Sequence, residues 1–172
     1  MNRTALRVLP ALAVAALLAS CSTNPVTGKN DLMLVGEGSE IQMGQKNFAP
    51  MRQAEGGDYV MDPGLTTYVQ QVGQRLAAVS DRKLPYEFAV LNNSIPNAWA
   101  MPGGKIGVNR GLLTQLKSES ELAAVLSHEI VHAAARHSAQ QASRGMLLQG
   151  GLLVAQVAAS DSDYGGLDAA AA

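Results

Sequence analysis

Cysteine is almost absent from this sequence, and so is any concentration of charge of one sign. Cys21 is the single cysteine, which excludes an internal disulfide. The chain has 13 basic and 14 acidic residues and a formal net charge of −1, and its lysines and arginines form no run. A surface of this kind does not predict nucleic acid as a partner.

Long apolar runs are also missing. The two longest, residues 8–18 and the run within 144–159, are both shorter than the roughly 20 residues that a membrane-spanning helix needs. Glutamine and glycine interrupt the second run at Gln149, Gly150, Gly151 and Gln156. It therefore predicts a core helix packed against its neighbour.

The first apolar run follows Arg3 and Arg7 and is typical of an export signal. It ends in Leu18-Ala19-Ser20-Cys21, which resembles the bacterial lipobox, in which the cysteine is lipidated. We therefore expect a lipoprotein signal peptide at 1–20 and a lipidated N-terminal tether at 21–38. The alternative is an incidental or buried thiol behind an ordinary signal. Because Ser22 is not aspartate, resemblance to enteric lipoproteins favours a periplasmic protein anchored to the outer membrane.

Residues 39–172 are enough for one modest domain with a real core. Apolar spacing, caps and turn residues predict helices, one strand and one hairpin, and hence an α+β, mostly helical domain. The expected elements are a short strand or loop at 32–35, a helix at 39–53 capped by Ser39, a helix at 63–79 opened by Asp62-Pro63, a strand at 86–92, a hairpin within 97–113 around Pro102-Gly103-Gly104, and a helix capped by Ser118 or Ser120 that runs to Arg136.

The segment "SHEIVHAAARHS", residues 127–138, contains all three histidines of the chain. On a helix, His128 and His132 differ by about 40° in direction and project side by side. Glu129 lies on the adjoining surface. This is the His-Glu-x-x-His pattern of two zinc ligands and a general base. Zinc would activate a water, whose proton the glutamate would take and pass to the departing amine.

Chance is the alternative explanation of this motif, and the residues around it argue against chance. They are uncharged and would bury the helix and keep the site dry: Leu126, Ile130, Val131 and Ala133.

The third histidine, His137, raises a separate question. On a continuous helix it would point about 140° away from His132 and 180° from His128. "HAAARH" has no glycine to break the helix, so we expect His137 either to lie at the helix end or to contact a metal ligand without binding the metal itself.

A catalytic zinc takes three protein ligands and keeps one open position, and the motif supplies two ligands. No glutamate follows Glu129 in the sequence, and Asp161, Asp163 and Asp168 lie in an irregular tail. Either an unusual aspartate is the third ligand, or the chain stops before it.

Three blocks together resemble the M48 family of zinc metallopeptidases, nearest to its periplasmic lipoprotein and outer-membrane quality-control members. They are "NPVTGKNDLMLV", "NAWAMPGGKIGVNRGLL" and "ESELAAVLSHEIVHAAARHS". The resemblance implies a zincin-like fold with a small sheet or hairpin beside the active-site helix. It implies one Zn²⁺ per chain, and an edge strand lining the substrate cleft, formed by Asn97, Ala98, Trp99, Ala100 and Met101.

The resemblance also implies function. It predicts an endopeptidase that hydrolyses unfolded or misassembled envelope proteins, with the outer-membrane assembly machinery as a candidate partner. The family's third ligand is a glutamate in a Glu-x-Glu-Ala-Asp type motif on a later helix, which this sequence does not contain. We therefore expect 39–172 to be the N-terminal, incomplete part of the peptidase domain. The alternative is a catalytically incomplete, protease-like lipoprotein that acts as a binding or chaperone module.

Overall fold

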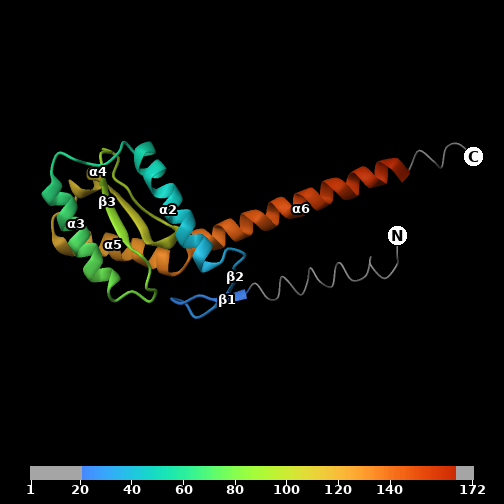
Figure 1. Ribbon diagram of the computed structural model, residues 1–172, viewed down its shortest axis with the longest axis horizontal. Helices are drawn as coiled ribbons and strands as arrows, with labels where there is room; N and C mark the ends of the chain where they lie inside the picture. Colours follow the sequence, from blue (N-terminus) through green and yellow to red (C-terminus); the bar gives the residue numbers. More distant parts are fainter. Residues whose placement is uncertain (1–20, 166–172) are drawn as a thin grey trace, which may run out of the picture.

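A small sheet lies at the centre of the fold, with helices on both of its faces (Figure 1). The computed structural model describes residues 21–165, so the expected signal peptide at 1–20 and the tail at 166–172 lie outside the described residues. The sheet has the order β3-β5-β4. Its strands are β3 (Glu87–Leu91), β4 (Ala98–Met101) and β5 (Lys105–Asn109). Strand β5 pairs with β3 in parallel and with β4 antiparallel.

Successive side chains of β3 point to opposite faces of the sheet, as in any strand, so β3 contributes to a hydrophobic cluster on each face. Phe88 and Val90 face the helices α3 (Pro63–Ala77) and α5 (Glu119–Ala134), where the main hydrophobic cluster lies. Ala89 and Leu91 face the opposite way, toward Phe48 of α2 (Glu37–Ala54). Helix α5, which carries the His-Glu-x-x-His motif, is therefore fixed by the main core, and α2 covers the other face.

The predicted hairpin is confirmed. β4 and β5 are joined by η1 (Pro102–Gly104), a short 3₁₀ turn in which Gly103 has a φ of 74°. α2 packs directly on this turn, and a Cβ at Gly44 would collide with the carbonyl oxygen of Pro102. Glycine at this position lets the helix lie against the hairpin.

Two of the three predicted caps are in place. The side chain of Asp62 accepts a hydrogen bond from the backbone N–H of Leu65, with Pro63 opening α3. Ser118, and not Ser120, caps α5 by accepting from the N–H of Glu121. The third cap is wrong, because α2 begins earlier than expected, at Glu37, and follows Gly36 instead of Ser39. A short helix, α4 (Arg110–Leu113), leads from the hairpin toward α5.

The N-terminal segment folds against the start of the last helix. β1 (Cys21–Thr23) and β2 (Asn30–Leu32) form an antiparallel pair within the segment expected to be the tether. Met33 and Val35 then pack against Ala139 of α6 (His137–Gly165). The Asn24 side chain donates to the carbonyl of Ala135, which fixes this segment to the end of α5.

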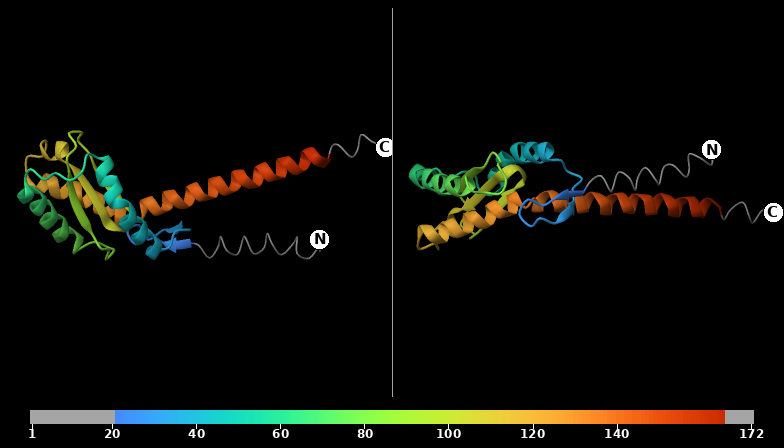
Figure 2. Two further views of the ribbon diagram at one scale, coloured as in Figure 1. Left: turned by 45° about the horizontal axis from the view of Figure 1, so that its top comes forward. Right: turned by 90° about the horizontal axis from the view of Figure 1, so that it is seen from below.

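The prediction of a packed core helix within 144–159 is wrong. These residues belong to α6, which extends away from the rest of the fold in every view (Figures 1 and 2). Only the first turns of α6 contact the body, so its apolar side chains are left exposed: Met146, Leu147, Leu148, Leu152 and Leu153. No helix in the described range 21–165 has the length and apolarity needed to cross a membrane. The predicted class is nevertheless confirmed: an α+β, mostly helical fold with a hairpin beside the His-Glu-x-x-His helix.

Candidate active site

The residues of the His-Glu-x-x-His motif line an open cleft of about 490 Å³ between α5, the start of α6 and strand β4. α5 contributes the two histidines and the glutamate of the motif, and β4 forms the facing wall. The cleft is lined by Ala98, Trp99, Ala100, His128, Glu129, His132, His137, Ser138 and Gln141.

His128 and His132 face each other as the spacing predicts. Their Nε2 atoms are 2.9 Å apart, and the two rings cross edge to face at 84° with centroids 4.5 Å apart. Nitrogens bound at about 2.0–2.1 Å to one tetrahedral zinc ion are separated by about 3.3 Å, so a small outward shift of the two rings would fit this pair to such an ion. Among the residues whose side chains the structure describes, no three or more His, Cys, Asp or Glu are arranged to hold a metal; the side chains of Asp161, Asp163 and Asp168 lie outside them. The described chain thus offers two ligands.

Glu129 lies in the wall of the cleft next to both histidines. Its exposed fraction is 9%, so the carboxyl group is largely shielded while still lining the cavity. Leu126 and Ile130 belong to the main core and hold this part of the helix in place. Val131 was also expected to be buried, but its exposed fraction is 44%, because it lies on the outer side of α5.

The predicted substrate strand is partly in the cleft. Ala98, Trp99 and Ala100 line it, while one edge of β4 pairs with β5 and the sheet ends at the other edge. Asn97 instead accepts a backbone hydrogen bond from Asn109, and Met101 packs in the cluster around Phe48. These two residues stay predicted contacts with substrate, outside the lining of the cleft.

The expectation that His137 faces away from the other histidines is wrong, because the helix breaks. α5 ends at Ala134, Arg136 has a φ of 61°, and α6 begins at His137. The Nδ1 atoms of His132 and His137 are 2.5 Å apart, so the three rings form a row. Desolvation, followed by the neighbouring His132, lowers the pKa of His137 below its ordinary value.

A buried ion cluster that the sequence did not reveal supports the break. Glu40, 1% exposed, accepts hydrogen bonds from both terminal nitrogens of Arg82 and from Nε of Arg136. Arg82 also donates to the carbonyl of Ala133, near the end of α5. Although burial opposes its charged form, hydrogen bonds and charge from Glu40 raise the pKa of Arg82 above its usual value. Glu40 resembles an ordinary first-turn acid in the sequence, so only the fold could identify this role.

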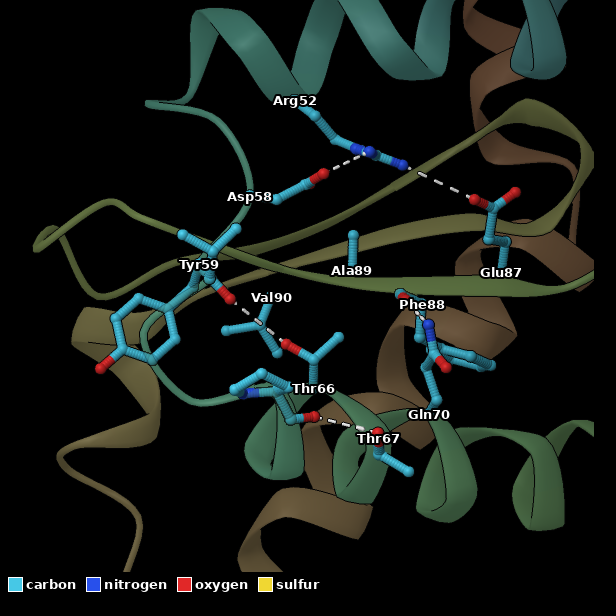
Figure 3. A pocket seen from close by; sticks show the side chains of 12 residues that line it. Arg52, Asp58, Tyr59, Thr66, Thr67, Gln70, Glu87, Phe88, Ala89 and Val90 are labelled. Atoms are coloured by element: carbon cyan, nitrogen blue, oxygen red, sulfur yellow. Dashed lines mark hydrogen bonds and ion pairs between the residues drawn. The ribbon is translucent and has the colours of Figure 1, made fainter.

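A second cavity, of about 400 Å³, lies at the opposite edge of the sheet, beside β3 and α3 (Figure 3). It contains no histidine. The guanidinium of Arg52 reaches over Ala89 and is paired with Asp58 at 2.5 Å and with Glu87 at 3.6 Å. Its arginine and its two carboxylates are thus paired with one another, and it lacks the pair of histidines that lines the cleft beside β4.

A His-Glu-x-x-His helix packed beside the free edge of a small sheet defines the metallopeptidase class. Residues 63–170 match Peptidase family M48, and the chain belongs to that family.

Named relatives fall in the same group. Mitochondrial metalloendopeptidase OMA1 of Schizosaccharomyces pombe is 47% identical over 77 residues, which cover 44% of this chain and 23% of the relative. The beta-barrel assembly-enhancing protease of Escherichia coli K12 is 35% identical over 122 residues, 70% of this chain and 25% of the relative. A putative beta-barrel assembly-enhancing protease of Vibrio cholerae is 37% identical over 119 residues, which cover 64% of this chain and 24% of the relative. The chain spans about a quarter of the length of these relatives.

Proposed function

We propose that the chain provides the active-site part of a zinc-dependent endopeptidase of the bacterial cell envelope, which hydrolyses misfolded or misassembled proteins. The observation that carries this proposal is the pair of Nε2 atoms of His128 and His132, 2.9 Å apart, beside the shielded carboxyl group of Glu129. His128 and His132 would hold the ion. A zinc ion bound there would polarise the scissile carbonyl group and make a water molecule more acidic.

Side chains and backbone groups of this chain account for proton transfer and substrate binding. Glu129 is the general base that takes the proton of the attacking water and passes it to the departing amine. The outer edge of β4 offers backbone hydrogen bonds to an extended segment of substrate. Recognition through the backbone tolerates many sequences, but it requires an unfolded segment. This requirement fits misfolded proteins as the substrate class.

The relatives support the envelope as the setting. The name of the Escherichia coli relative ties that protein to β-barrel assembly, which supports proposing outer-membrane precursors as substrates and their assembly machinery as a partner. The Schizosaccharomyces pombe relative is named as mitochondrial, so location rests on the chain's own N-terminal residues.

Zinc binding and casein cleavage test the proposed function. We expect one zinc per chain and casein fragments that disappear when zinc is chelated and return when zinc is added back. His128→Ala and His132→Ala should each abolish stoichiometric binding, since each removes one of two described ligands. Gln149→Ala, on the exposed part of α6, is the control. Casein that binds to the chain without being cut would contradict the endopeptidase and favour the binding or chaperone module.

We further propose that Cys21 carries the lipid and anchors the protein to the outer membrane. Cys21 directly follows the signal-like run and is the first residue of β1. In a bacterial host, Cys21→Ser should lose incorporation of labelled fatty acid and move from the membrane to the soluble periplasmic fraction. Ser22→Ala should keep both properties. A Cys21→Ser chain that still incorporated the fatty acid would contradict the lipid anchor.

A further inference from the structure

The third histidine of the motif region contacts a metal-binding histidine on its far side. His132 Nε2 faces His128, at 2.9 Å, and His132 Nδ1 faces His137 Nδ1, at 2.5 Å. We propose that His137 is a positioning residue that fixes the tautomer and the ring orientation of His132. The proposal rests on the zinc site of the proposed function and assigns a role to a residue outside the His-Glu-x-x-His motif.

The argument follows from how one imidazole uses its two nitrogens. A neutral ring has one N–H donor and one lone pair, and a ring that binds a metal through Nε2 must carry its proton on Nδ1. His132 Nδ1–H then donates to Nδ1 of His137, so His137 carries its own proton on Nε2. Histidines that bind metals nearly always donate their other N–H to such a partner, which orients the ring.

The position of His137 excludes it as a ligand of the zinc ion that His128 and His132 would share. Its Nδ1 contacts the outer nitrogen of His132, not the space between the two Nε2 atoms. The contact depends on the turn at Arg136, whose φ of 61° is a left-handed backbone that residues other than glycine rarely adopt. That turn is held by two strong contacts, from Arg136 Nε to Glu40 at 2.8 Å and from Arg136 Nη2 to the carbonyl of Val35 at 2.7 Å. The fold thus stabilises an unfavourable backbone where it brings His137 to His132.

The test compares zinc affinity, measured by competition with a chromophoric chelator, with the imidazole tautomers seen in proton–nitrogen correlation spectra of the zinc-free chain. His137→Ala should weaken zinc binding by roughly 10–100-fold, the usual effect of losing such a partner. His137→Gln should recover most of the affinity, because its amide oxygen can accept the same N–H. In the unsubstituted chain His132 should carry its proton on Nδ1, and in His137→Ala it should become a mixture of tautomers.

Three results would overturn the proposal. They are an unchanged zinc affinity in His137→Ala, a His132 proton on Nε2 in the unsubstituted chain, or equal losses in His137→Ala and His137→Gln with reduced helicity. The last result would show that His137 only supports the packing of α6. His128→Ala separates this proposal from the proposed function. If His128→Ala still binds zinc normally, the proposed zinc site itself is wrong. If His128→Ala loses zinc and His137→Ala keeps its zinc affinity, the site stands and the positioning role fails.

Discussion

Glu40→Ala is expected to destabilise the fold by about 3–5 kcal/mol, the typical cost of removing one member of a buried ion pair. Glu40 is 1% exposed and is the acceptor shared by Arg82 and Arg136, whose exposed fractions are both 8%. Its loss removes the carboxylate paired with Arg136 and leaves Arg82 with the exposed Glu37 alone. Since whole domains are stable by only about 5–15 kcal/mol, this single change removes a large share of the total.

Urea unfolding followed by circular dichroism measures the effect. Glu37→Ala is the matched control, because it removes the same charge from the same helix and also pairs with Arg82, at 3.2 Å. The Glu37 side chain is 61% exposed, so its pair should contribute less than about 1 kcal/mol. Glu40→Gln should fall between the two, since it keeps one oxygen acceptor but loses the charge. Equal stabilities for Glu40→Ala and Glu37→Ala would contradict a structural role for the buried cluster.

Local signals predicted the helices and the hairpin well. Asp62-Pro63 opens α3, Ser118 caps α5, and Pro102-Gly103-Gly104 turns between β4 and β5. Each of these features is decided by residues a few positions apart, so the sequence carries the information. The facing pair His128 and His132 followed for the same reason, because helix geometry alone brings residues four apart together.

The larger failures concern contacts between distant parts of the chain. The parallel pairing of β3 with β5 requires the chain to cross over, and nothing within either strand specifies it. The break after α5 has no glycine; it is held at Arg136 by Glu40, 96 positions away in the sequence. The same contact brings His137 to His132, so a helix extrapolated from periodicity placed His137 on the wrong side. Likewise, apolar content in α6 could not tell a packed helix from one that extends away from the fold.

Glu129→Gln is expected to lower kcat for casein by roughly 10²–10⁴-fold, the usual contribution of a general base. Glutamine has nearly the same shape as glutamate but cannot accept a proton at neutral pH. KM should change little, because substrate is proposed to bind along β4 and not to Glu129. Zinc affinity should also stay close to that of the unsubstituted chain, since the ligands are His128 and His132. Steady-state kinetics and chelator competition on the same preparations measure both quantities.

The control for this prediction lies on the same helix. Glu121 is an exposed glutamate in the first turn of α5, outside the cleft, and Glu121→Gln should leave kcat unchanged. Two results would contradict the proposed role of Glu129, and they have different meanings. Unchanged cleavage in Glu129→Gln would show that another group takes the proton. A loss of cleavage that follows a loss of zinc would make Glu129 part of the binding site, because a base that only moves protons leaves metal affinity intact. A selective fall in kcat is therefore the result that assigns the base to Glu129 and leaves the metal to the two histidines.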